Sequence, residues 1–163
     1  MRLWRLSGLR HAEAMDGGYG LFFDGRWNTI GRRVTYAATS PSLCVLEKLV
    51  HVEDPMLLPQ LAMVSYYVSD DIRVDRRRVD QLSGDWRRRE ALTQQLGNQW
   101  LDGVEAVLLF VPSVIVPIAD GPDWNVLINH RHPEAKNIDI ARIEPFELDV
   151  RLFTHPRAEL DGA

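Results

Sequence analysis

The feature that most constrains the fold is a near-continuous apolar run at residues 105–113, EAVLLFVPS. A run of this kind is typical of a strand that is buried on both faces, because no polar alternation gives it a solvent face. Further strands are predicted at 3–6, 34–38, 61–69 and 146–153, helices at 41–52 and 86–101, and a helical turn at 124–130. Since the strands outnumber the long helices and do not alternate with them regularly, the predicted fold class is α+β, with a mixed β-sheet core and flanking helices.

Length and composition limit the classes of protein that the chain can belong to. Its 163 residues predict a single domain, 1–163, and the net charge of -4 argues against direct nucleic-acid binding, which favours a basic excess. Cys44 is the only cysteine and cannot form an internal disulfide, which fits a reducing compartment. The start of the chain has no apolar core typical of a signal peptide, and no stretch has the length of a membrane helix. A cytoplasmic protein without a membrane segment is expected.

Two arginine-rich stretches could suggest a binding surface. They are RVDRRRVD at 73–80 and RRRE at 87–90, and both carry acidic residues among or beside the arginines. Such mixed runs are most often solvated surface, which is the interpretation favoured here. A contact surface for an acidic partner is the alternative.

The predicted helix 41–52 contains a carboxylate in an unusual place. Ser40 is a suitable N-cap and Pro41 a suitable first helical residue. At about 100° per residue, Glu47 falls within the apolar stripe that contains Leu43 and Val50. Burying an unpaired carboxylate is costly. Glu47 is therefore expected either to form a buried salt bridge with an arginine or to have a functional role.

Two residues upstream favour the functional role, because a turn, a strand and a facing helix can bring Arg26, Tyr36 and Glu47 to one cleft. Arg26 carries a planar, permanently charged fork that suits a diphosphate. Tyr36 offers a ring for stacking and a hydroxyl. Glu47 could hold a ribose hydroxyl and stabilise a cationic sugar, as carboxylates do in glycoside hydrolysis. Taken singly, Tyr36 could equally be a core residue and Arg26 a surface residue.

Polar residues follow the buried strand, where sites in sheet proteins often collect. Ser113 stands at the end of that strand, and the chain has no G-x-S-x-G motif that would make it a hydrolase nucleophile. A hydrogen bond from Ser113 to a ligand is the preferred interpretation, against an ordinary turn serine. Asn125 and Asn129 could face the same cleft or could cap local backbone.

Two segments of the chain together resemble a known family. They are GRWNTIGRRVTYAATSPSLCVLEKLVH and VPSVIVPIADGPDWNVLINHRHP. In the order and spacing of their arginine, tyrosine, glutamate and proline-serine pair they resemble the RES domain, which is named for arginine, glutamate and serine. The resemblance extends over nearly the whole chain, from LWRL to DVRLF.

The resemblance implies a fold and an activity. RES proteins are toxins of bacterial toxin–antitoxin modules with a fold similar to ADP-ribosyltransferases. They consume NAD by breaking the nicotinamide–ribose bond, so NAD is expected as the substrate here, and no metal is expected. The family's catalytic positions fall on Arg26, Tyr36, Glu47 and Ser113. The expected NAD contacts are Arg26, Trp27, Asn28, Tyr36, Ser113 and Asn125.

The resemblance also implies a partner. This partner is an Xre-type antitoxin, which has a helix-turn-helix domain and covers the toxin's active site with its other end. The sequence does not decide whether the toxin forms a homo-oligomer within that complex. His130 stands where relatives often have proline. His130 and His132 are expected to be structural or surface residues rather than acid–base catalysts.

Three functions follow from these features. The preferred one is a growth-arresting toxin that depletes NAD, with water or phosphate as the acceptor. The second is a protein ADP-ribosyltransferase that uses the same pocket. The third is a non-catalytic interaction module that docks a partner through the charged helix 86–101.

Overall fold

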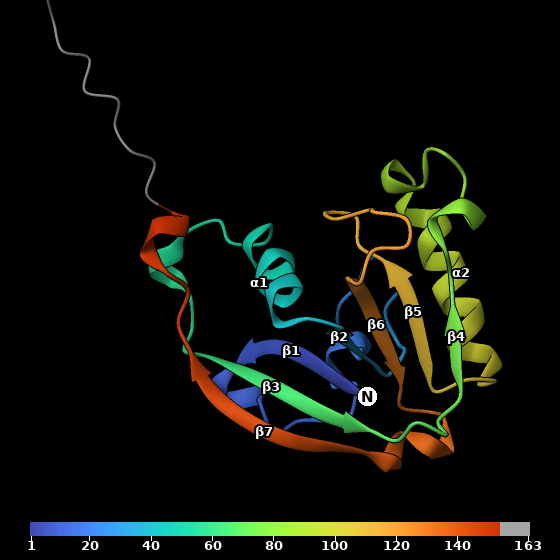
Figure 1. Ribbon diagram of the computed structural model, residues 1–163, viewed down its shortest axis with the longest axis horizontal. Coiled ribbons are helices and arrows are strands. Elements are labelled where there is room, and N and C mark those ends of the chain that lie inside the picture. Colours follow the sequence, from blue (N-terminus) through green and yellow to red (C-terminus); the bar gives the residue numbers. More distant parts are fainter. Residues whose placement is uncertain (154–163) are drawn as a thin grey trace, which may run out of the picture.

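A computed structural model of the chain describes residues 1–153 and contains one twisted seven-stranded sheet with two α-helices (Figure 1). The strand order across the sheet is β4-β5-β6-β2-β1-β3-β7. The elements are β1 (Arg2–Gly8), β2 (Val34–Ala38), α1 (Pro41–Leu49), β3 (Leu61–Val68), β4 (Val74–Arg76), α2 (Glu90–Gly103), β5 (Leu108–Pro112), β6 (Trp124–Asn129) and β7 (Ile138–Phe146). Short 3-10 turns connect them. The predicted α+β class is confirmed.

All neighbouring strands pair antiparallel except β4 and β5, which are parallel. All five residues of β5 are buried, so the prediction of a strand covered on both faces is confirmed. β4 lies inside the arginine-rich stretch 73–80, where the sequence predicts only solvated surface. Its three residues show no apolar pattern, and the strand forms through backbone pairing with β5. None of the helices in residues 1–153 has the length and apolar character needed to cross a bilayer.

Two predicted elements are wrong. Residues 124–130 form the strand β6 rather than a helical turn: Val126 and Ile128 point to one face of the sheet and Leu127 to the other, and both faces are covered. The closing strand predicted at 146–153 does not form, because the last strand, β7, ends at Phe146. A 3-10 turn, Val150–Leu152, then follows, capped by the Asp149 side chain, which accepts a hydrogen bond from the Arg151 N–H at 2.9 Å.

Both α-helices pack on the same face of the sheet. Successive side chains of a strand alternate between faces, so Val34, Tyr36 and Ala38 of β2 share one face. Val34 and Tyr36 pack in the cluster beneath α2, and Ala38 packs in the cluster beneath α1. The middle of β2 and the adjoining β6 therefore form the floor between the two helices.

The opposite face of the sheet buries the largest core. Its cluster joins residues of β1 and β3 to residues of β5 and β6, so it spans most of the sheet and ties the two halves together. Ala12 and Met15 from the segment after β1 pack against it. The burial of this face is what fixes the register of the strands that carry the polar residues of the first face.

Helix α2 holds the turn at residues 25–28 by direct backbone contact. The Thr93 hydroxyl donates to the carbonyl of Arg26 at 2.8 Å, and the Gln94 amide donates to the carbonyl of Gly25 at 3.1 Å. One turn further along α2, Gly97 lies so close to the turn that a Cβ there would stand 1.8 Å from the carbonyl oxygen of Trp27. The turn that carries Arg26 is therefore positioned by the helix that faces it.

His130 joins the start of β2 to the end of β6. Its Nε2 lies 2.8 Å from the Thr35 hydroxyl oxygen, so this histidine has a structural contact, as expected. Burial is the main cause that lowers the pKa of His130 from 6.5 to about 4, and the nearby Arg5 and Arg33 lower it further against an opposing effect of Asp16. The neutral ring is the form that fits the fold.

We expect Gly97→Ala to destabilise the fold by about 2 kcal/mol or more, because the added methyl group forces α2 away from the 25–28 turn. Urea unfolding measures the effect. Gly103→Ala is the matched control, since a Cβ at Gly103 meets nothing within 4 Å and alanine favours a helix. Equal stability of the two variants would contradict the close contact between helix and turn.

The pKa of His130 also predicts a pH dependence. The unfolded chain binds a proton at this histidine near pH 6.5, whereas the folded chain does so only near pH 4. Stability is therefore full above pH 6.5 and falls as the pH drops toward 4, by about 2 kcal/mol after allowance for partial exposure. Unfolding at pH 7.5 and 5.0 should show a larger loss for the wild type than for His130→Gln. A loss of the same size in both proteins would rule out this group as the cause.

Candidate active site

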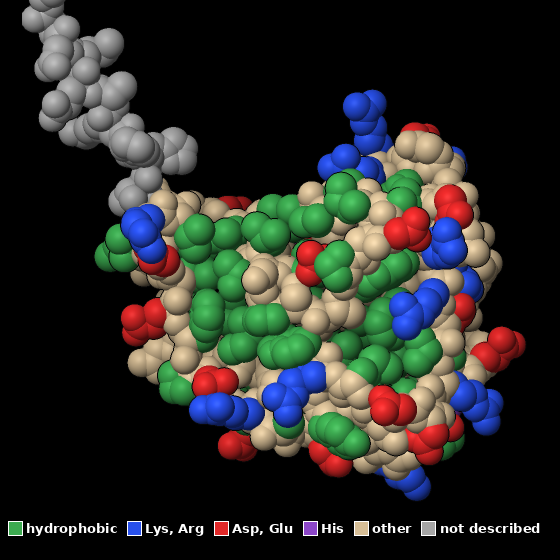
Figure 2. All heavy atoms as spheres, viewed as in Figure 1, with side chains coloured by type: hydrophobic (Ala, Val, Ile, Leu, Met, Phe, Trp, Pro, Cys, Tyr) green, Lys and Arg blue, Asp and Glu red, His purple; other side chains and the backbone are tan. Residues whose placement is uncertain are grey.

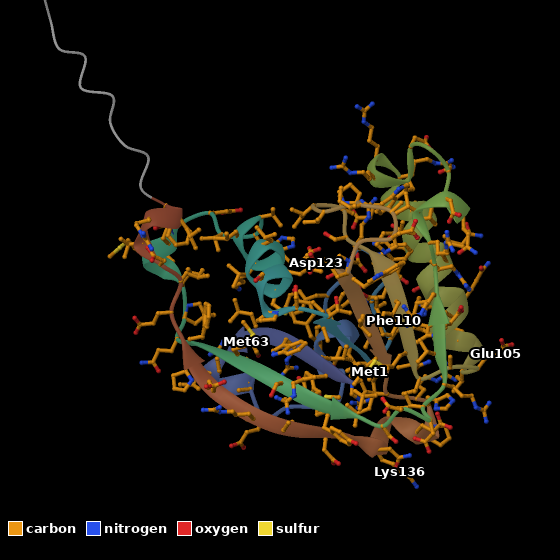
Figure 3. All side chains as sticks on the ribbon, in the orientation of Figure 1. Met1, Met63, Glu105, Phe110, Asp123 and Lys136 are labelled. Carbon is orange, nitrogen blue, oxygen red and sulfur yellow. The ribbon has the colours of Figure 1, made fainter. Side chains whose placement is uncertain are left out.

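Helix α1 begins where β2 ends, and its N-terminus is fixed by two contacts of Ser40. The Ser40 hydroxyl accepts a hydrogen bond from the Leu43 N–H at 3.2 Å and donates to Asp123 Oδ1 at 2.5 Å. Asp123 lies between α1 and the strands β5 and β6 (Figure 3). The predicted cap is thus confirmed, and the helix is tied to the loop before β6. This attachment sets the direction in which the last turns of α1 present their side chains.

Glu47 points from α1 toward the strands, where two side chains donate to the same carboxylate oxygen. Ser113 Oγ lies 2.8 Å from Glu47 Oε1, and Asn125 Nδ2 lies 2.5 Å from it. Within residues 1–153, no arginine or lysine forms an ion pair with Glu47, and Oε2 has no hydrogen-bond partner. The buried salt bridge that the sequence left open is absent from this part of the chain. One oxygen is held by the protein and the other is free to meet a ligand.

The apolar stripe of α1 differs from the prediction. Leu43 and Cys44 are buried, but Leu46 is 39% exposed and Val50 is 60% exposed. Glu47 lies on the same side of α1 as Leu43 and Cys44, so the prediction that it points inward is confirmed. The buried face is centred on Leu43 and Cys44, whereas the predicted stripe contained Val50. The partly buried Glu47 carboxylate therefore borders an accessible apolar surface.

Ser113 acts on both Glu47 and its own loop. Its hydroxyl oxygen accepts hydrogen bonds from the backbone N–H groups of Ile115 at 3.0 Å and Val116 at 3.1 Å. Ser113 is fully buried, and donation to Glu47 completes its hydrogen bonding. The Ser113 hydroxyl is thus engaged by Glu47 and by its own loop, whereas the sequence predicts a hydrogen bond to a ligand.

Tyr36 is placed in the middle of β2 and supports the turn at residues 25–28. Its hydroxyl donates to Asn28 Oδ1 at 2.7 Å and accepts from the Trp27 N–H at 3.0 Å. Burial of the hydroxyl raises the pKa of Tyr36 well above its usual range, so it remains protonated. The ring is half-buried, which leaves part of its surface available for stacking.

Arg26 extends from that turn to Trp86, which lies in a short 3-10 helix, Trp86–Arg88. Its guanidinium donates to the carbonyl of Trp86 at 2.5 Å and lies over the Trp86 ring at 5.8 Å. Within the described residues it has no carboxylate partner, and its buried Nε has no hydrogen-bond partner. A guanidinium held from one side by a carbonyl and a ring keeps its charge available for an anion.

The surroundings of Arg26 and of Glu47 meet at two consecutive residues. Ser113 bonds Glu47, and Val114 packs against the cluster that contains Trp27 and Trp86. Asn125 of β6 pairs with Ala38 of β2. Ala38 is two residues after Tyr36, so its side chain points to the same face of the sheet. Glu47, Ser113 and Asn125 are thus in direct contact at the end of β5. Tyr36 contacts the turn that carries Arg26, on the same face of the sheet.

Other predicted residues have structural roles. Trp27 and Asn28 are each 1% exposed, so they support the turn from inside rather than line an open surface. Asn129 is buried, and its amide donates to the carbonyl of Leu101 at 3.0 Å. The His132 Nδ1 accepts from the Glu134 N–H at 3.1 Å, in agreement with the structural role predicted for it.

Cys44, one helical turn before Glu47, is unsuited to nucleophilic catalysis. Its thiol donates to the carbonyl of Trp4 at 3.2 Å. Burial raises the pKa of Cys44 to about 12, so the thiol stays neutral. Glu47 is therefore the charged group that this helix brings to the sheet.

The contacts of α2 and Trp86 with the 25–28 turn have no signal in the sequence, because they are hydrogen bonds to backbone atoms or packing between distant segments. In residues 1–153, no three His, Cys, Asp or Glu side chains form a group that could hold a metal.

A hollow of about 590 Å³ is lined by Gly84, Asp85, Arg87, Arg88 and Val114. A second hollow of about 230 Å³, between Arg78 and Trp124, contains none of the predicted catalytic residues.

Comparisons with known proteins identify the family of the chain. The RES domain family matches residues 2–149. A protein called Toxin Res from Pseudomonas putida is 41% identical over 94% of this chain and all of its own length. A protein called Prs ADP-ribosylating toxin from a Sphingobium species is 32% identical over 87% of this chain and 88% of its own length.

The fold also resembles a solved structure. A chain from the crystal structure of the M. tuberculosis MbcT-MbcA toxin-antitoxin complex superposes with a TM-score of 0.68 and 19% identity, covering 89% of this chain and 83% of that chain. The match over residues 2–149, together with the relative that is 41% identical, establishes that the chain belongs to the RES domain family.

Proposed function

We propose that this protein is a RES toxin that depletes NAD by breaking the bond between nicotinamide and ribose. The observation that carries the proposal is the Glu47 carboxylate, which has no cationic partner in the described chain and is hydrogen-bonded at one oxygen only. Arg26 supplies an unpaired positive charge on the same face of the sheet. A carboxylate and a guanidinium that do not neutralise each other suit a ligand that carries a cationic centre and a diphosphate.

In the proposed reaction, the C–N bond between ribose and nicotinamide breaks and its electron pair moves to nicotinamide. Nicotinamide is cationic in NAD and leaves as a neutral molecule, so it needs no general acid. Positive charge builds on the ribose, and Glu47 stabilises it electrostatically. Water or phosphate then forms the new bond to the ribose carbon. Arg26 binds the diphosphate, and Tyr36 offers its half-buried ring to nicotinamide.

Ser113 and Asn125 orient Glu47 in this scheme. Both donate to Oε1, which fixes the carboxylate plane and leaves Oε2 toward the substrate. A group that is already oriented does not have to reorganise as charge develops, which is the main source of electrostatic catalysis. The two residues therefore act through Glu47 and are positioning residues.

A second candidate function is ADP-ribosylation of a protein by the same site. It is favoured by the relative from Sphingobium, whose name is Prs ADP-ribosylating toxin. The bond that breaks is the same, and a protein side chain replaces water or phosphate as acceptor. Incubation with labelled NAD and cell lysate separates the two functions: label on a protein band supports transfer, and free ADP-ribose or its phosphate ester supports breakdown.

The proposed partner is an Xre-type antitoxin with a helix-turn-helix domain. We propose that the two proteins act in the cytoplasm, and that residues 1–163 of the toxin form a single domain. Large apolar side chains are exposed on and near α1, and Figure 2 shows apolar side chains gathered over this side of the molecule. The exposed residues are Leu46, Val50, Met56, Leu57, Val150 and Leu152. An exposed apolar surface beside a site supports a protein partner that covers it.

We expect Glu47→Gln to lower kcat for NAD loss by about a hundred- to a thousandfold, because it removes the charge that faces the ribose. NAD is followed by chromatography with the purified protein. Glu53→Gln is the matched control, since Glu53 is exposed on the segment after α1. If the Glu47 and Glu53 variants consumed NAD at equal rates, the assignment of Glu47 would be refuted. No turnover by the wild type would instead favour the non-catalytic interaction module.

Asn125→Ala and Ser113→Ala should behave differently. Each removes one donor to Glu47, so kcat falls in both, by about tenfold, with little change in KM. Only Ser113→Ala also leaves two partly buried N–H groups without their acceptor, which costs about 1 kcal/mol of stability or more. Kinetics together with thermal unfolding test this. An Asn125 variant with unchanged kcat, or a Ser113 variant of full stability, would argue against these roles.

A further inference from the structure

The 3-10 turn next to Arg26 carries two further arginines that have no partner. Arg87 and Arg88 are exposed, and neither forms an ion pair or a hydrogen bond through its guanidinium with another residue in 1–153. They differ from Arg77, which pairs with Asp75, and from Arg89, which pairs with Asp85. Arg76 also has no ion pair in the described residues, but its guanidinium lies over the Phe110 ring. The sequence alone gives both stretches the same interpretation.

Both arginines line a hollow that borders the candidate active site. The hollow has a volume of about 590 Å³, within the roughly 300–1,000 Å³ that is usual for ligand sites. Val114 also lines the hollow, and the preceding residue, Ser113, donates a hydrogen bond to Glu47. The one carboxylate of the hollow, Asp85, is engaged by Arg89 at 3.8 Å, which leaves an excess of positive charge on the lining.

Trp86 links this hollow to Arg26. Its carbonyl and ring hold the Arg26 guanidinium, and the next two residues in the chain are Arg87 and Arg88. Because Trp86 is 3% exposed and packed with Trp27, the start of the turn is fixed although the arginine side chains are free. Trp86 therefore contacts the Arg26 guanidinium and directly precedes Arg87 and Arg88, and none of these three arginines has a carboxylate partner in the described residues.

We infer that Arg87 and Arg88 bind a phosphate group in this hollow, extending the anion site that begins at Arg26. Arginine suits this because its planar fork donates two parallel hydrogen bonds to phosphate oxygens. The inference rests on the proposed function, which brings two sources of phosphate to the site. One is the diphosphate of NAD, and the other is inorganic phosphate acting as the acceptor.

The test compares Arg87→Ala/Arg88→Ala with Arg2→Ala/Arg142→Ala, which removes the same charge from exposed positions on β1 and β7. If the NAD diphosphate is the ligand, the first variant raises KM for NAD by about tenfold with kcat within about twofold. Its binding of nicotinamide riboside, which has no phosphate, should not change. If inorganic phosphate is the ligand, only KM for phosphate rises. Kinetics indistinguishable from the control for both ligands would overturn the inference.

The same variants separate this inference from the proposed function. If the wild type consumes no NAD, the proposed function fails, and titration calorimetry with pyrophosphate still decides on the anion site. Binding by the wild type and the control, but not by the Arg87/Arg88 variant, would support the phosphate site. Absence of pyrophosphate binding by all three proteins, or equal binding by all three, would refute it.

Discussion

The candidate site depends on the two hydrogen bonds that hold one oxygen of Glu47. They join α1 to β6 and to the end of β5, so they connect three elements that are far apart in the sequence. A carboxylate in a partly buried position is normally neutralised by a cation. Here it is satisfied instead by neutral donors, which hold its orientation without cancelling its charge. That difference distinguishes Glu47 from a structural ion pair and is the basis of the role proposed for it.

The same principle applies to Arg26, which is held by a carbonyl and an aromatic ring rather than by a carboxylate. The turn that carries it is fixed from two sides. The Tyr36 hydroxyl donates to the Asn28 side chain of the turn, and the Thr93 hydroxyl of α2 donates to the Arg26 carbonyl. Both charges of the site are thus oriented by neutral groups on one face of the sheet. Opposite charges that remain unpaired within the described chain are expected where a ligand supplies the missing partners.

The sequence predicted the fold class, the buried strand β5 and the strand β2 because each has a strong local pattern. It failed for β4 and for the end of β7, where backbone pairing and a side-chain cap decide the structure. β6 was misassigned because a short apolar run with two asparagines fits either a helical turn or a strand, and only burial on both faces distinguishes them.

For the site, the sequence placed Glu47, Ser113 and Asn125 near one cleft, and these three are in contact, but it did not predict the hydrogen bonds that join them. Glu47 was found because a carboxylate within an apolar stripe is a local conflict. The burial of Trp27 and Asn28 and the anchoring role of Trp86 depend on packing between segments some sixty residues apart, for which the sequence has no periodic signal. The positioning role of Ser113 likewise depends on the position of a helix that precedes it by some sixty residues.

The most direct test of the account is a crystal structure of the Glu47→Gln protein with intact NAD bound. The account predicts that the nicotinamide-bearing ribose lies against the side chain at position 47 and that the diphosphate contacts Arg26. NAD bound in another part of the molecule, with its ribose distant from position 47, would contradict it.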